Sequence, residues 1–168
     1  MKTGKVIQQE DIQDILELTK ISNISEAPTA GSNLNKWRNS LKYQIDYQLF
    51  PELCKTIENF INDGTKVNQF DLLLYKEGHY YKKHKDVFWI NNSGRHRKLS
   101  AVIQLSDPND YEGGDLTFFE CNQYPNKEDI REQGTVTFFP AFIDHQANPV
   151  LKGTRYSIAI WFEGPKWR

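Results

Sequence analysis

The chain has 168 residues, of which 38% are hydrophobic and 26% are charged, and its formal net charge at pH 7 is −1. This composition is typical of one globular domain, and the near-neutral charge gives no reason to expect nucleic acid or an anionic membrane as a partner. The charged N-terminus lacks the apolar segment of a signal peptide, no membrane-length apolar run occurs, and the two cysteines match no metal-ligand spacing, so we expect a cytoplasmic protein.

Two helices are predicted in the first third of the chain. Residues 8–21 place isoleucine and leucine at helical spacing, which favours an amphipathic helix. Residues 22–36 are rich in Ser, Asn and Gly and indicate a loop. A second helix is predicted over residues 50–62, with Pro51 in its first turn and Gly64 as its stop signal.

The rest of the chain has the pattern of a β protein. Short β-branched or aromatic runs alternate with clusters of Gly, Pro, Asn and Asp, and no helical segment separates them. The runs cover residues 70–75, 99–105, 116–120, 135–140 and 155–162. We therefore predict a mainly β (α+β) fold of the sandwich or jelly-roll type, as a single domain over 1–168 with helical support in 1–66 and the β core in 67–168.

His84 and Asp86 stand two positions apart in a run that resembles a strand. Strand side chains alternate between faces, so both would point into the same space. A divalent metal needs a third ligand, and His145 is the best candidate because a jelly roll brings distant strands side by side. Two histidines and one carboxylate with open positions are typical of a non-haem Fe(II) oxygenase site.

Arg155 lies in a strand whose two faces differ. Period two places Arg155, Ser157 and Trp161 on one face, opposite a set of apolar residues that should pack in the core. A buried guanidinium is costly unless it is paired, and its planar fork fits a carboxylate. The neighbouring sequence offers Arg155 no evident acid, so a bound dicarboxylate is the predicted partner.

Each of these residues also has a simpler interpretation. His84 could be a surface strand residue, and His145 a core histidine bonded to backbone. Arg155 could be exposed if the faces are reversed, and Tyr75 and Tyr81 could form only cross-strand aromatic contacts. The "EGGD" segment could be only a turn. Two histidines, an aspartate and an arginine in this order are harder to explain in that way.

Over about residues 68–165 the chain resembles the Fe(II)/2-oxoglutarate dioxygenases, specifically the prolyl 4-hydroxylase-like branch. The segment "YKEGHYYKKHKD" resembles that family's Tyr-x-x-Gly-x-x-Tyr-x-x-His-x-Asp pattern. "KLSAVIQLSDPNDYEGGDLTFF" resembles its strand and Gly-Gly-x-Leu-x-Phe turn, and "FFPAFIDHQANPVLKGTRYSIAIWF" resembles its distal histidine and Arg-x-Ser motif. The last segment is most similar to PKHD-type hydroxylases.

The resemblance implies a double-stranded β-helix in which His84, Asp86 and His145 hold Fe(II). It implies 2-oxoglutarate as cosubstrate and O2 as oxidant, with succinate and CO2 released, and leaves room for ascorbate. Matched positions imply roles around the cosubstrate for Arg155, Tyr75, Ser157, Gln104, Leu116 and Trp161. Gln104 departs from the family, because relatives often carry a tyrosine there. No acid–base side chain is required by this chemistry.

The substrate stays open at this point. A prolyl residue of a protein or peptide is the family default, and a free amino acid or small metabolite is the alternative. Nucleic-acid dealkylation is disfavoured because that branch carries a second arginine downstream of the cosubstrate arginine, and the tail here offers only Arg168. A cupin-like binding module is disfavoured because Asp86 stands where cupins carry histidine. We expect Tyr81, Arg95 and Arg97 to contact substrate, with residues 87–98 as either a mobile lid or a solvated hairpin loop.

Overall fold

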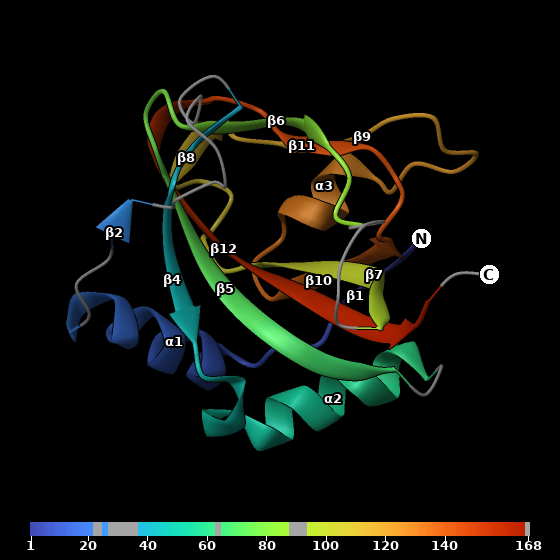
Figure 1. Ribbon diagram of the computed structural model, residues 1–168. Coiled ribbons are helices and arrows are strands. Elements are labelled where there is room, and N and C mark those ends of the chain that lie inside the picture. Colours follow the sequence, from blue (N-terminus) through green and yellow to red (C-terminus); the bar gives the residue numbers. More distant parts are fainter. Residues whose placement is uncertain (22–24, 27–36, 63–64, 88–93, 167–168) are drawn as a thin grey trace.

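The computed structural model describes residues 1–21, 25–26, 37–62, 65–87 and 94–166 (Figure 1). Its strands form two antiparallel sheets. The larger sheet contains β1 (Lys2–Lys5), β2 (Ser25–Glu26), β4 (Leu41–Ile45), β5 (Lys66–Lys76), β7 (Arg95–Gln104), β8 (Tyr111–Gly113), β10 (Thr135–Pro140) and β12 (Val150–Pro165). The smaller sheet contains β3 (Arg38–Asn39), β6 (Tyr80–His84), β9 (Leu116–Phe118) and β11 (His145–Ala147).

The strand order brings distant segments of sequence together. The larger sheet runs β1-β10-β7-β12-β5-β4-β2, with β8 paired to β12, and the smaller sheet runs β3-β6-β11-β9. The last strand, β12, therefore lies between β5 and β7 at the centre of the larger sheet, while β11 lies beside β6. This arrangement is the predicted jelly roll, and the predicted fold class is confirmed.

Three α-helices, α1 (Gln9–Ile21), α2 (Pro51–Ile61) and the short α3 (Lys127–Arg131), and the 3-10 helix η2 (Tyr47–Leu49) complete the described structure. In Figure 1, α1 and α2 lie below the larger sheet, and β6 and β11 lie on its other side. The central strands are therefore covered on both faces. Alternate residues of β12, such as Ile158 and Ile160, join the core that includes Ile12 and Ile57 of the helices. Their neighbours face the smaller sheet, where Ala159 and Trp161 pack in a second cluster.

The first third of the chain contributes more to the sheets than the sequence predicts. Strands β1, β2, β3 and β4 all lie within the region expected to give helical support, and β1 and β4 pair with β10 and β5. These strands are too short or too polar to show a clear period, and their backbone partners define them instead. Helix α2 also differs, since its C-cap is Asn62 in the left-handed conformation. Gly64, the expected stop signal, lies outside the described residues.

Replacement of Ile158 tests this account of the core. Ile158 is fully buried between the larger sheet and the helices, so Ile158→Ala should lower the free energy of unfolding by about 2–5 kcal/mol. Urea unfolding followed by circular dichroism measures the change. Leu151→Ala is the matched control, because Leu151 lies on the same strand and is 66% exposed. Equal losses in the two variants would contradict the assignment of the core.

Among the residues that the structure describes, no helix combines the length and the apolar character that a membrane crossing requires.

Candidate metal and dicarboxylate site

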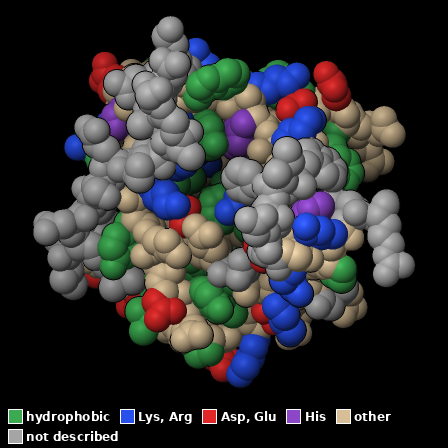
Figure 2. All heavy atoms as spheres, viewed as in Figure 1, with side chains coloured by type: hydrophobic (Ala, Val, Ile, Leu, Met, Phe, Trp, Pro, Cys, Tyr) green, Lys and Arg blue, Asp and Glu red, His purple; other side chains and the backbone are tan. Residues whose placement is uncertain are grey.

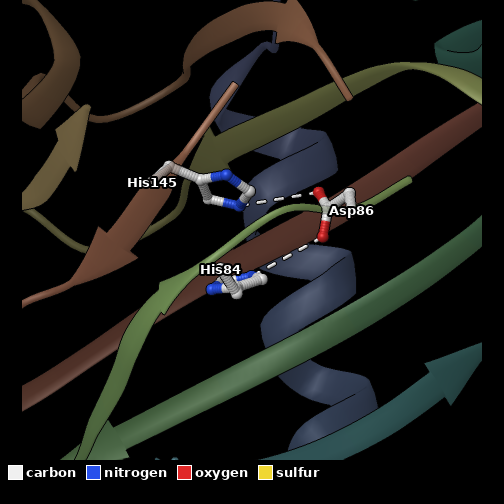
Figure 3. Close-up of side chains that lie close together, drawn as sticks. All are labelled: His84, Asp86 and His145. Carbon is white, nitrogen blue, oxygen red and sulfur yellow. Dashed lines mark ion pairs between the residues drawn. The ribbon is translucent and has the colours of Figure 1, made fainter. Parts of the chain in front are cut away.

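Two histidines and one aspartate meet between the two sheets (Figure 3). His84 is the last residue of β6, and His145 is the first residue of β11, directly opposite it in the strand pairing. Asp86 lies just beyond the end of β6, where its backbone N–H donates to the carbonyl of Ala141 at 2.9 Å. The strand thus ends earlier than the sequence predicts, but this backbone bond still holds Asp86 beside both rings.

The three side chains lie close enough to share one cation. The Nε2 atoms of His84 and His145 are each 3.6 Å from an oxygen of Asp86, one from Oδ1 and the other from Oδ2. All three candidate ligand atoms lie within 4.8 Å of one another. Figure 3 shows the rings and the carboxylate converging on one point from two strands and the segment after β6. One face of a metal ion fits this set, and its other positions stay open.

Backbone bonds fix the tautomer of both histidines. The Nδ1 atom of His84 is 2.8 Å from the carbonyl of Lys82, and Nδ1 of His145 is 3.0 Å from the carbonyl of Ile143. A carbonyl only accepts hydrogen bonds, so in each ring the proton is on Nδ1. The lone pair of each Nε2 atom therefore points toward Asp86, as a metal ligand requires.

The charge states also suit a metal ion. Burial by itself would raise the pKa of Asp86, but His145, His84 and the Ser100 hydroxyl together outweigh burial and hold that pKa below its ordinary value. Ser100 Oγ donates to Asp86 Oδ2 at 2.6 Å. Burial lowers the pKa of His145, against the opposing effect of Asp86. An ionised carboxylate and a neutral imidazole are the forms that bind metals.

A pocket of about 500 Å³, with its open mouth included, extends from these residues to the part of β12 between Arg155 and Trp161. Figure 2 shows the surface hollowed near the middle of the view, with Lys or Arg side chains and a histidine at its edge. The pocket is lined by Arg38, Leu73, Tyr75, Tyr81, His84, Asp86, Ala101, Val102, Leu116, His145, Ala147, Arg155, Ser157, Ala159 and Trp161. The candidate metal ligands and Arg155, which is predicted to bind a dicarboxylate, thus line the same pocket.

Arg155 is a buried cation that has no acid partner among the described residues. It is 4% exposed, and the described part of the chain places no carboxylate within ion-pairing distance of it. Close by, Ser157 Oγ and Trp161 Nε1 are buried and lack hydrogen-bond partners among the described residues. Buried polar groups are normally satisfied. A ligand carboxylate at Arg155 would supply the missing charge and accept a bond from Ser157.

Tyr75 and Gly114 shape the space around Arg155. The phenol ring of Tyr75 is 2% exposed and lies 5.7 Å from the Arg155 guanidinium carbon, and burial raises the pKa of Tyr75, so it stays a neutral donor. Gly114, in the "EGGD" segment, has φ +64°, and a Cβ there would lie 3.2 Å from Cδ of Arg155. This turn therefore lets the backbone pass close to the arginine.

Gln104 is not among the residues that line the pocket, so its implied contact with the cosubstrate stays a prediction. Its Oε1 accepts a hydrogen bond from Arg155 Nε at 3.0 Å, and its Nε2 donates to Ser106 O and Tyr111 Oη. Because its amide nitrogen is bonded to these two oxygens, the Gln104 side chain is fixed, and its carbonyl oxygen fixes the guanidinium of Arg155 in turn. Gln104 lies in β7 and is 1% exposed.

A charge placed on Gln104 should disturb ligand binding through Arg155. Gln104→Glu would give Arg155 the acid partner that it lacks and would repel a ligand carboxylate. We expect the Kd for 2-oxoglutarate, measured by calorimetry, to rise by about ten- to a hundredfold, the size of one hydrogen bond to a charged group. Gln146→Glu, on β11 outside the pocket, is the matched control. An unchanged Kd in Gln104→Glu would contradict this positioning role.

Arg38 is a pocket residue that the sequence does not indicate. It comes from β3, which pairs with β6, and its Nε donates to Ser40 Oγ at 2.7 Å while its guanidinium carbon lies 4.7 Å from the centre of the Tyr81 ring. Arg38 thus reaches the pocket from the region that was expected to give only helical support. No local motif marks Arg38, because only the pairing of β3 with β6 brings it to the pocket.

Of the three residues predicted to contact substrate, only Tyr81 lines the pocket. Tyr81 lines the pocket and stacks on His84, with 3.6 Å between ring centres. Arg97 lies over the Trp161 ring at 4.1 Å, whereas Arg95 is exposed and donates to the Glu163 carbonyl. Both arginines belong to strand β7 and not to a loop. Residues 88–93, the middle of the predicted lid, lie outside the described residues.

Comparison with known proteins assigns the family. A profile of the 2OG-Fe(II) oxygenase superfamily matches residues 70–163, which is more than half of the chain. The chain belongs to the 2OG-Fe(II) oxygenase superfamily. Members of this superfamily are 2-oxoglutarate-dependent enzymes, so the predicted enzyme class is confirmed and the cupin-like alternative is disfavoured.

Several relatives and solved structures are similar to this oxygenase. It is 27% identical to a PKHD-type hydroxylase of Pseudoalteromonas atlantica, covering 90% of this chain and 76% of that protein. A PKHD-type hydroxylase of Prochlorococcus marinus is 28% identical over 96% of this chain and 76% of its own. The fold resembles a viral collagen prolyl hydroxylase of Paramecium bursaria Chlorella virus 1, with a TM-score of 0.70, 18% identity, and 97% and 95% of the two chains covered. A Pseudomonas putida prolyl-4-hydroxylase gives a TM-score of 0.66 at 20% identity, covering 96% and 90%.

Proposed function

We propose that this oxygenase hydroxylates an unactivated C–H bond, most readily of a prolyl or other residue in a peptide or protein, and releases succinate and CO2. One observation carries the proposal: His84, Asp86 and His145 converge in the pocket that also contains Arg155, which has no acid partner among the described residues. In the balanced reaction, one atom of O2 enters the substrate as a hydroxyl group, and the other enters succinate as 2-oxoglutarate loses CO2. The prolyl hydroxylases among the structural neighbours and the PKHD-type relatives support this reaction class.

The residues present fit an iron ion. Two imidazoles with free Nε2 lone pairs and an ionised carboxylate form the donor set that Fe(II) oxygenases use, with open positions left over. When bound, Fe(II) supplies the oxygen chemistry that breaks the C–H bond, and 2-oxoglutarate supplies two electrons. Ser100 fixes the carboxylate of Asp86, and the two backbone carbonyls fix the rings, so the chain presents its ligands already oriented.

The far end of the pocket fits the distal carboxylate of 2-oxoglutarate. Arg155 supplies the charge, Ser157 a free hydroxyl and Tyr75 a neutral phenol. Leu116, Ala159 and Trp161 line the walls of the same pocket. Low exposure at this end excludes water and strengthens the pairing of opposite charges.

A succinate-release assay tests the proposal. Purified protein with Fe(II), O2 and 2-oxoglutarate should form succinate, with more formed when an accepted peptide or amino acid is added. Asp86→Ala removes the shared carboxylate and should reduce succinate formation to background. Succinate formation that is equal in Asp86→Ala and in the unaltered protein would refute the proposed site, and no succinate with any acceptor would refute the proposed reaction.

A further inference from the structure

The pocket contains a second arginine that the proposed chemistry does not use. Arg38 lines the same pocket as the metal triad and Arg155, and it comes from the smaller sheet, whereas Arg155 comes from the larger one. Its Nε is bonded to Ser40, but its Nη2 atom is buried and has no hydrogen-bond partner among the described residues. A buried guanidinium nitrogen without an acceptor is costly, so a bound molecule is the natural source of the missing oxygen.

The charges of the pocket favour an anion over a neutral carbonyl. Asp86 is the one carboxylate among the described lining residues, and the segments 27–36 and 88–93 contain no Asp or Glu. Asp71 of β5 is not among the lining residues and is already paired with Lys42. With Fe(II) and 2-oxoglutarate bound, the metal and two arginines carry four positive charges, while Asp86 and the cosubstrate carry three negative charges. One positive charge, that of Arg38, is left unmatched.

The size of the pocket limits which molecules can place a carboxylate beside Arg38. The hollow encloses about 500 Å³ with its mouth included, and the cosubstrate occupies part of it. Because the 500 Å³ include open space at the mouth, the enclosed part leaves room only for a small molecule or a single side chain. The carboxylate must therefore belong to the residue that is hydroxylated or to its immediate neighbour.

We propose that Arg38 pairs with a carboxylate of the substrate, and that the acceptor is an amino acid with a free α-carboxylate. Two sources supply that chemistry, a free amino acid and the C-terminal residue of a peptide. The inference rests on the proposed function, because it assigns Arg155 to 2-oxoglutarate and the open metal face to the reacting C–H bond. Arg38 is then a specificity residue that holds the acceptor by a charge-assisted hydrogen bond while Tyr81, under its guanidinium, packs against the metal ligand His84.

Binding without turnover tests this pairing. Protein loaded with Mn(II) and saturating 2-oxoglutarate, without O2, is titrated by calorimetry with the free L-amino acids, with tripeptides Ala-Ala-X that have a free carboxyl group, and with the carboxamide of each. At least one free acid should bind, and its amide should bind at least about tenfold more weakly. Binding of the amino acid alone identifies a free substrate, and binding of the tripeptide identifies a C-terminal residue.

Variants of Arg38 distinguish a role in binding the acceptor from a role in binding 2-oxoglutarate. Arg38→Gln should weaken the best acid to the level of its amide and leave the Kd of 2-oxoglutarate within about twofold, which also shows that the variant is folded. Arg38→Lys should restore part of the acid binding, and Lys152→Gln, which removes an exposed cation outside the pocket lining, is the control.

Three results would overturn the inference alone: amides that bind as tightly as acids, no binding by any free acid, or an equal loss of 2-oxoglutarate affinity in Arg38→Gln. Failure of the unaltered Mn(II) protein to bind 2-oxoglutarate would overturn the proposed function as well.

Discussion

His145→Ala is expected to abolish metal-dependent formation of succinate. The variant removes one of two neutral imidazole donors and leaves His84 and Asp86 on one side of the pocket. Even loss of an outer-shell partner costs a metal site about 10–100-fold in affinity or activity, so removal of a direct ligand should cost more than about 100-fold. Mn(II) affinity, followed by electron paramagnetic resonance, and succinate formation should fall together.

A second histidine provides the control for this result. His79 lies in the turn before β6, outside the pocket lining. His79→Ala should keep Mn(II) affinity and succinate formation within about twofold of the unaltered protein. If His145→Ala retained full metal affinity, or if His79→Ala lost as much, His145 would not be a ligand.

Arg155→Leu is expected to weaken 2-oxoglutarate binding while metal affinity changes little. Removal of one partner from a buried, hydrogen-bonded charge pair costs about 2–5 kcal/mol, which corresponds to a rise of at least about thirtyfold in Kd. Calorimetric titration of 2-oxoglutarate into Mn(II)-loaded protein measures the change. Both the Kd and the KM for 2-oxoglutarate should rise, because the distal carboxylate is held in the same way before and during the reaction.

The matched control is Lys152→Ala. Lys152 lies on the same strand, and its exposed side chain pairs with Glu112 on the surface. Exposed ion pairs contribute little, so Lys152→Ala should leave the Kd for 2-oxoglutarate unchanged. A small effect of Arg155→Leu, similar to that of the control, would place the distal carboxylate elsewhere.

The local sequence predicted those parts of the site that strand geometry fixes. His84 and Asp86 are separated by one residue, and Arg155 follows the period of β12, so their directions could be derived from alternation. His145 required the added expectation that a jelly roll joins distant strands, and the family resemblance supported it. The observed pairing of His145 with His84 is a tertiary contact that neither segment encodes alone.

Other contacts that depend on tertiary pairing were not predicted. Arg38 reaches the pocket because a two-residue strand pairs with β6, and no periodicity marks so short an element. Gln104 is in the expected strand, but its hydrogen bonds to Arg155 and Tyr111 follow from packing across the sheet. For the same reason Arg95 and Arg97 appeared as loop residues in the polar sequence, although they extend β7 and pair with the end of β12.

Coupling between metal and 2-oxoglutarate tests the central claim most directly, because one ligand is proposed to bridge the triad and Arg155. The Kd for 2-oxoglutarate should be measured by calorimetry without O2, in metal-free protein and in Mn(II)-loaded protein. We expect Mn(II) to tighten binding at least about tenfold, and His145→Ala to remove that difference. An equal Kd with and without Mn(II) would contradict a shared site for the metal and the cosubstrate.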